Sequence, residues 1–147
     1  MNFTIEIDGI GEFEAVIAET AASVPADLGK FRKKVASRLY RGVLRRSPRD
    51  TGYFASNWHL SKGQVDETVN APGGKFYPAP DEASEIARLD GLGAEEDAFL
   101  SNGTDYGVYL EDGHSDQAPL GIVSVTFLEE ITIINSIENL DEYLRLN

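Results

Sequence analysis

Hydrophobic residues recur at helical spacing between residues 28 and 43. They fall on one stripe of a helical wheel, which is typical of an amphipathic helix: Leu28, Phe31, Val35, Leu39 and Val43. A start signal precedes them, because Ser23 stands before Pro25 and Asp27 lies in the first turn. Pro48 marks the end, since the residue before a proline leaves the helical region. The pattern predicts one long amphipathic helix.

Shorter patterns predict strands on either side of this helix. Residues 3–7 alternate apolar and polar positions and are typical of a strand, and residues 13–20 fit a helix. Residues 54–60 fit a strand that carries the only tryptophan, Trp58. Residues 99–100 fit a further strand before the Ser-Asn-Gly turn that follows them.

The last third of the chain combines a helical turn with an ambiguous segment. Residues 106–111 fit a helical turn that ends at Gly113. Residues 120–127 are rich in β-branched residues, as strands are, yet their apolar positions continue a helical stripe. We favour a helix that begins near Pro119, and a strand over 120–127 is the close alternative.

A long segment without periodicity separates the predicted strands. Residues 63–97 are rich in Gly, Pro and acids, and we expect an extended acidic loop with a short helix around 81–89. Loops of this length are uncommon in compact domains and are often functional or ordered only on assembly. Residues 136–147 are expected to form a C-terminal tail. The fold class predicted is therefore α+β: one domain over 1–147, with a small, mostly antiparallel sheet packed against one long amphipathic helix plus shorter helices.

Composition limits the function classes. A chain of 147 residues is about one domain. Cysteine is absent, which excludes disulfides, thiolate metal sites and cysteine nucleophiles. The longest uncharged apolar stretch, residues 118–128, is too short to span a bilayer, and the acidic N-terminus does not resemble a signal peptide. We expect a soluble protein, made in the cytosol, with no membrane partner.

Charge is unevenly distributed along the chain. The net charge is −12, yet residues 30–49 hold nine bases and no acid. Five of these bases form a stripe on the predicted helix: Lys30, Lys34, Arg38, Arg41 and Arg45. Like charges at this spacing repel each other, which indicates an acidic neighbour. Such segregation also suggests a face that meets a partner of opposite charge.

The tripeptide Asp50-Thr51-Gly52 is the strongest candidate for catalysis, because it stands at the centre of aspartic proteases. That chemistry needs two buried carboxylates that share a proton. A homodimer could supply the second carboxylate. The flanking residues instead have turn chemistry, and we interpret the tripeptide as a turn. No phosphate-binding loop, dinucleotide fingerprint or zinc spacing is complete. We therefore expect no enzyme activity, no catalytic residues, no cofactor and no metal.

Nucleic-acid binding through the basic helix, residues 30–46, is the alternative function. A stripe of four or five bases could contact phosphates, but no aromatic residues interleave with it to stack bases. The rest of the chain is acidic, whereas nucleic-acid-binding domains typically carry a net positive charge.

Two segments resemble a known family. Residues 46–58 (RSPRDTGYFASNW) are similar to a segment of tailed-bacteriophage neck proteins in which a basic helix leads to Pro-x-Asp-Thr-Gly and a tryptophan. Residues 106–123 (YGVYLEDGHSDQAPLGIV) are similar to their Tyr-Ala-x-x-Leu-Glu-x-Gly-x-Ser-x-Gln-Ala-Pro-x-Gly-Met-Val segment. The two segments stand in the family's order, and this chain departs from the pattern at Asn57, Gly107 and Ile122. These proteins are called tail-completion, head–tail joining or minor tail protein Z-like proteins.

The resemblance implies a small α+β structural subunit of the virion neck, at the top of the tail, assembled in the host cytoplasm. Such a subunit forms a homo-oligomeric ring, expected to be six-fold. The ring joins the tail terminator or tube to head-connector or stopper proteins, and DNA passes through its bore without specific binding. We expect the interface to contain residues from both segments and from the basic stripe: Lys34, Arg38, Arg41, Arg45, Arg49, Asp50, Glu111, His114 and Gln117.

Overall fold

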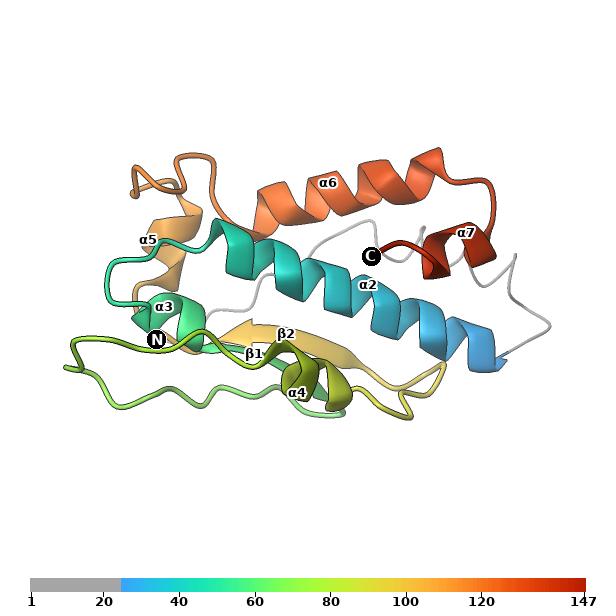
Figure 1. Cartoon of the computed structure of the whole chain (residues 1–147), viewed down its shortest axis with the longest axis horizontal. Helices are drawn as coiled ribbons and strands as arrows, with labels where there is room; N and C mark the ends of the chain where they lie inside the picture. Colours follow the sequence, from blue (N-terminus) through green and yellow to red (C-terminus); the bar gives the residue numbers. More distant parts are fainter. Residues whose placement is uncertain (1–24) are drawn as a thin grey trace.

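A computed structural model describes residues 25–147 (Figure 1). The strand predicted for 3–7 and the helix predicted for 13–20 lie outside the described residues. The elements follow in the order α2 (Pro25–Arg46), α3 (Tyr53–Ser56), β1 (Trp58–Lys62), α4 (Glu82–Ala87), β2 (Ala98–Asn102), α5 (Gly107–Glu111), α6 (Val123–Ser136) and α7 (Leu140–Leu144). The predicted α+β class is confirmed. None of the described helices is both long enough and apolar enough to cross a bilayer.

Helix α2 is the centre of the fold, with α6 and α7 on one side and the sheet on the other (Figure 1). The long helix is confirmed. Because α2 is covered on two sides, its buried surface is wider than the predicted stripe. Tyr40 and Leu44 lie outside the stripe and are buried, whereas Val35 and Leu39 lie on it and are only half-buried.

The hydrophobic core divides into two clusters. The larger joins α2 to the sheet and contains Tyr40, Val43, Leu44, Phe54, Trp58, Leu60, Leu89, Ala118 and Ile122.

The smaller core cluster joins α2 to the C-terminal helices. Phe31 packs against Ile134 of α6 and Tyr143 of α7, and the rings of Phe31 and Tyr143 lie 5.0 Å apart. Tyr143 is fully buried. The segment expected as a C-terminal tail therefore contains a short helix that packs on α2.

Strands β1 and β2 pair in antiparallel fashion, with Leu60 opposite Leu100. The strand predicted for residues 54–60 is wrong over its first half, because α3 makes a helical turn there and the strand begins at Trp58. The side-chain amide of Asn57 donates to the Tyr53 carbonyl at 2.7 Å and closes that turn, which the alternation of residue types does not reveal. The second predicted strand is confirmed and is longer than expected.

The segment between the strands is extended and mostly exposed, as predicted, and the short helix within it is confirmed as α4. Asp81 caps α4 by accepting a hydrogen bond from the Ser84 amide at 3.3 Å. Leu89, just after α4, is fully buried in the main core cluster. This part of the segment is therefore fixed to the body of the domain.

The ambiguity over residues 120–127 is resolved in favour of a helix. Residues from Val123 onward belong to α6, and the strand alternative is wrong. Helix α5 and the turn at Gly113 are confirmed. A side chain from α5 supplies hydrogen-bond acceptors for the first amides of α6, so tertiary contacts outweigh the strand preference of β-branched residues.

Candidate functional site

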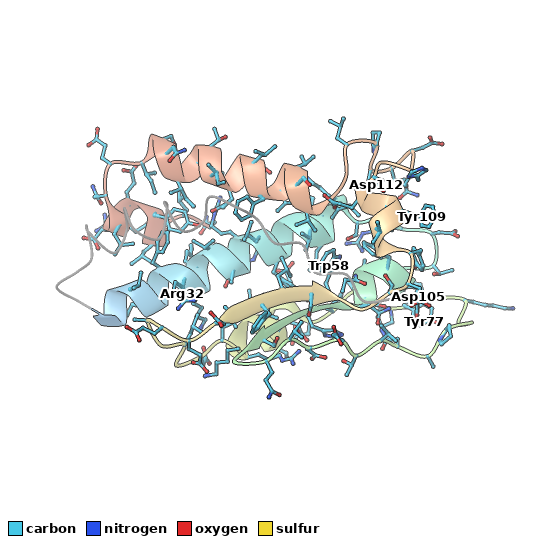
Figure 2. The ribbon with its side chains drawn as sticks, turned by 180° about the vertical axis from the view of Figure 1, so that it is seen from behind. Arg32, Trp58, Tyr77, Asp105, Tyr109 and Asp112 are labelled. Atoms are coloured by element: carbon cyan, nitrogen blue, oxygen red, sulfur yellow. The ribbon has the colours of Figure 1, made fainter. Side chains whose placement is uncertain are left out.

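The two sequence segments singled out above, residues 46–58 and 106–123, lie together at one end of the molecule. The Arg49 amide donates to Oε1 of Gln117 at 2.8 Å. The ring of Phe54, just after the first turn, lies 5.8 Å from that of Tyr106 at the start of α5. Figure 2 shows Tyr109 and Asp112 at this end of the molecule, beyond α2 and the sheet. We call this region the motif end.

Glu111 organises the second segment. Its carboxylate accepts hydrogen bonds from the amides of Ile122 at 2.9 Å and Val123 at 2.8 Å. It also accepts from the amide of Ser124 at 2.8 Å and from the Ser124 hydroxyl. Burial opposes ionisation, but these hydrogen bonds outweigh it and hold the pKa of Glu111 below its ordinary value. A negative charge here also matches the positive end of the α6 dipole.

Two glycines let the chain close a loop between Glu111 and α6. Gly113 and Gly121 both have positive φ angles, of 83° and 86°. A Cβ at Gly113 would lie 2.4 Å from the Pro119 carbonyl oxygen, and a Cβ at Gly121 would lie 2.6 Å from that of Glu111. The glutamate and glycines of the segment thus have structural roles in one tight loop.

The outer surface of this loop exposes apolar and aromatic side chains. Tyr109 is 64% exposed and Leu120 is 79% exposed. The ring of His114 packs edge-on to Tyr109 at 5.5 Å, and its Nδ1 lies 3.1 Å from the Tyr109 carbonyl oxygen. Exposed side chains of this size are available to a partner surface.

Asp50 lies in a turn, as interpreted from the sequence. Gly52 has φ +85°, and the Tyr77 amide donates to the Thr51 carbonyl at 2.9 Å. The Asp50 side chain is exposed. The guanidinium of Arg49 turns back to the Leu44 carbonyl at 3.1 Å and so holds the end of α2.

The basic stripe has its acidic neighbours within the same chain. Arg38 pairs with Glu130 at 2.7 Å, Arg41 with Glu82 at 3.1 Å, and Arg45 with Glu129 at 3.3 Å. Lys34 donates to the Leu146 carbonyl, and burial together with the charges of Arg38 and Arg41 lowers the pKa of Lys34. These four cations therefore make their contacts within the subunit, and a polymeric phosphate would compete with their in-chain partners.

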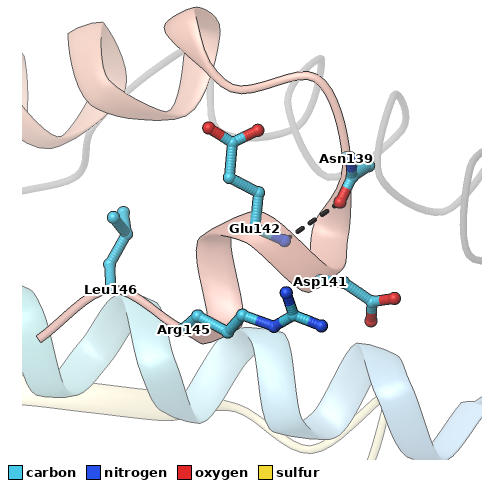
Figure 3. Close-up of a pocket in the computed structure, with 5 residues that line it drawn as sticks. All are labelled: Asn139, Asp141, Glu142, Arg145 and Leu146. Carbon is cyan, nitrogen blue, oxygen red and sulfur yellow. Dashed lines mark hydrogen bonds between the residues drawn. The ribbon is translucent and has the colours of Figure 1, made fainter.

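Helix α7, at the opposite end of the molecule from α5 (Figure 1), borders a hollow (Figure 3). The hollow holds about 610 Å³ and combines two exposed acids, one cation and an apolar side chain. Its lining residues are Asn139, Asp141, Glu142, Arg145 and Leu146. Asn139 caps the helix by accepting from the Glu142 amide at 3.0 Å. The hollow was not predicted from the sequence, because residues 136–147 were expected to form a tail and not a helix with a fixed arrangement of side chains.

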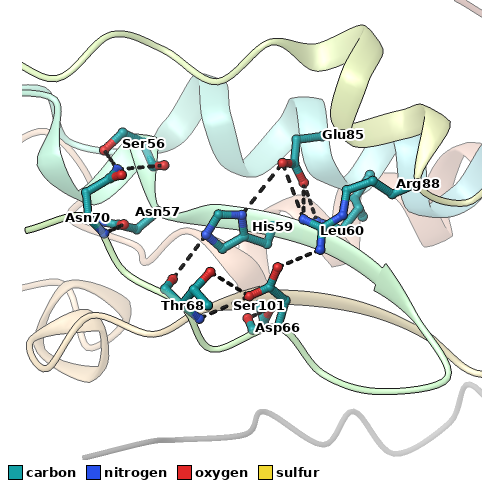
Figure 4. Close-up of polar contacts among 10 residues, drawn as sticks. All are labelled: Ser56, Asn57, His59, Leu60, Asp66, Thr68, Asn70, Glu85, Arg88 and Ser101. Atoms are coloured by element: carbon teal, nitrogen blue, oxygen red, sulfur yellow. Dashed lines mark hydrogen bonds and ion pairs between the residues drawn. The ribbon is translucent and has the colours of Figure 1, made fainter.

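A polar cluster on β1 was also not predicted (Figure 4). Arg88, just after α4, pairs with Asp66 at 2.5 Å and with Glu85 at 3.1 Å. Glu85 accepts from the Leu60 amide at 2.9 Å, and Nε2 of His59 lies 3.1 Å from the Thr68 carbonyl oxygen. Burial opposes ionisation of Asp66, but hydrogen bonds from Thr68 and Arg88 lower its pKa. The cluster fastens α4 and the first part of the loop to β1.

Comparison of the chain with protein-family models, with curated proteins and with solved structures found no match.

Proposed function

We propose that this chain is a structural virion protein that forms a ring at the head–tail junction of a tailed phage. The ring would complete the tail and join it to the head connector, with DNA passing through its bore. The observation that carries the proposal is the contact between the two resembling segments, which joins residues 49 and 117. Two short sequence likenesses thereby correspond to one continuous piece of structure.

The residues of the second segment support a binding role and not a chemical one. Glu111 is occupied by amides of α6, and the glycines shape the loop. The large hydrophobic side chains that α5 and the loop expose to solvent are Tyr109 and Leu120. A rigid loop that presents aromatic and aliphatic side chains fits a protein–protein contact.

The charge distribution fits a channel through which DNA slides. Most cations of the chain make contacts within the subunit, and the net charge is −12. An acidic bore repels phosphates, because binding DNA needs cations placed against its backbone. We expect acidic side chains to face the bore. Nucleic-acid binding by residues 30–46 is a weaker candidate, since Arg38, Arg41 and Arg45 already pair with carboxylates.

The test is the mass and symmetry of the purified full-length chain. We expect light scattering to show a concentration-dependent closed oligomer, and negative-stain microscopy to show rings with a central bore. Antibody labelling should place the protein at the neck of particles of the phage that encodes it. A chain that stays monomeric at high concentration and is absent from particles would overturn the proposal, and salt-sensitive DNA retention would favour the alternative.

A further inference from the structure

The loop between β1 and α4 presents an exposed phenylalanine on an anchored tip. Phe76 is 77% exposed. Its neighbour Tyr77 closes the tip, because the Tyr77 hydroxyl donates to the Ala71 carbonyl at 2.6 Å and accepts from the Gly74 amide at 2.7 Å. The Tyr77 amide is in turn bonded to Thr51 in the turn after α2. Residues 72–76 therefore form a short finger with a fixed base.

The other side of the base is tied to the core. The Asn70 amide donates to Oδ1 of Asn57 at 2.7 Å, and the Tyr53 hydroxyl donates to the Asn70 carbonyl at 3.1 Å. Asn57 is fully buried. A side chain displayed on a preorganised support loses little conformational freedom on binding, which favours its use as an anchor in an interface.

The finger also carries a cation that has no hydrogen-bond or ion-pair partner among residues 25–147. Lys75 is the only charged residue between Glu67 and Asp81. All thirteen Lys and Arg residues lie in the described part of the chain. Ten of them make polar side-chain contacts within residues 25–147 and Lys30 also has a partner, whereas Lys75 and Arg145 make no such contact there. On an otherwise acidic subunit, Lys75 is available to pair with acids of another molecule.

The hollow beside α7 has the complementary chemistry. Asp141 and Glu142 outnumber the one cation in its lining, and Leu146 supplies an apolar wall. The finger and the hollow lie at opposite ends of the molecule, as Figure 1 shows for the loop tip and α7. A contact between two different surfaces of identical subunits is heterologous, and such contacts close into rings when the rotation between subunits permits.

We infer that the finger of one copy docks in the α7 hollow of the next, with Phe76 against Leu146 and Lys75 beside Asp141 and Glu142. This inference rests on the proposed ring and names the contact that closes it. The occupant of the hollow is thus a second copy of this chain.

Cysteine cross-linking tests the contact directly, because the chain has no cysteine of its own. The double variant Lys75→Cys with Glu142→Cys cannot form a disulfide within one subunit, since a disulfide needs Cα atoms within about 7 Å and the loop tip lies at the opposite end of the molecule from α7. We expect a ladder of reducible covalent oligomers that ends at the subunit number of the ring. The matched control is Lys75→Cys with Leu128→Cys, which places the second thiol on the exposed face of α6 and should give no ladder.

Point variants measure the contribution of each group. Phe76→Ser should weaken assembly tenfold or more, whereas Leu128→Ser, also at an exposed apolar position, should not. Lys75→Glu should weaken assembly, and adding Glu142→Lys should restore it. Circular dichroism and urea unfolding of each monomer verify the fold.

The outcomes separate the two proposals. If the native chain forms rings but the cysteine pair cross-links no better than its control and Phe76→Ser assembles normally, the finger contact is wrong and the ring stands. If the native chain forms no ring, the proposed function fails and the finger contact fails with it.

Discussion

The backbone amide of Arg49 donates a hydrogen bond to Oε1 of Gln117 across 68 positions of sequence, at 2.8 Å. The bond joins the turn after α2 to the loop before α6. Gln117 is exposed, so its position is set by this bond and by the loop that Glu111 closes. The motif end is therefore one structural unit, and a substitution in either segment should alter the conformation or stability of the other.

Glu111 is expected to be the most sensitive carboxylate of that unit. Glu111→Ala removes the acceptor for three amides and should destabilise the protein by about 2–3 kcal/mol, since the part-buried amides of Ile122 and Val123 and the helix N-terminus lose their partner. Asp112→Asn changes an exposed neighbour and should have an effect within about 0.5 kcal/mol. Urea unfolding followed by circular dichroism measures both. Equal effects would show that the loop does not depend on the Glu111 carboxylate.

The same carboxylate should make stability pH-dependent. The pKa of Glu111 is below its ordinary value of 4.5 in the folded state, so at acid pH the unfolded chain binds the proton more readily. The stabilisation is present above pH 4.5 and is lost as pH falls through the folded pKa. The difference in urea midpoint between the native chain and Glu111→Gln should thus be largest near pH 7 and shrink toward pH 3. A difference that stays constant over this range would contradict the prediction.

Two ion pairs on α2 should differ strongly in how much they contribute to the stability of the protein. The Arg38–Glu130 pair has side chains only 16% and 8% exposed, and Tyr143 also donates to Glu130. Arg38→Met leaves a buried charge and should cost about 3–5 kcal/mol. Arg41 and Glu82 are 42% and 50% exposed, so Arg41→Met should cost at most about 1 kcal/mol. Chemical denaturation of both variants measures the loss in free energy of unfolding. Similar losses in the two variants would refute the prediction.

The turn after α2 should depend on Gly52 more than on Asp50. Gly52→Ala forces a side chain into a φ of +85° with its Cβ 2.5 Å from the Tyr77 carbonyl oxygen, and it should cost about 2 kcal/mol or more. Asp50→Ala should lower stability or assembly slightly, by less than about 1 kcal/mol, because the side chain is exposed. Thermal unfolding and light scattering measure the two effects. A peptidase activity that disappears in Asp50→Ala would instead revive the protease interpretation.

The loop should be cut by protease in the free subunit and protected after assembly. Lys75 is the only lysine or arginine between Lys62 and Arg88, and it is exposed. Trypsin should therefore cleave the monomer first after Lys75, whereas assembled rings should resist at this bond. Mass spectrometry of limited digests at low and high protein concentration identifies the site. The same cleavage rate in both states would count against docking of the finger.

Local signals in the sequence were sufficient where one residue type controls the backbone. Pro25 and Pro48 bracket the long helix, Gly113 ends α5, and Asp81 begins α4, as expected. The turn at Asp50-Thr51-Gly52 was also predicted, because glycine accepts the positive φ that this turn requires.

Prediction was wrong or incomplete where a side-chain hydrogen bond to the backbone decides the local structure. Residues 54–56 have strand-forming neighbours, but the buried Asn57 amide bonds back to Tyr53 and makes a helical turn. The β-branched start of α6 is helical because Glu111, eleven positions before Ile122, accepts its free amides. Neither contact leaves a trace in the local alternation of residue types.

The sequence by itself determined the long basic helix, the short elements with clear caps and the acidic character of the chain, because these follow from residue types close together. The tertiary structure decided which acids pair with the basic stripe, which two segments form the motif end, and where Phe76 and the α7 hollow lie. Those features depend on contacts between residues tens of positions apart, which become possible only after the chain packs on both sides of α2.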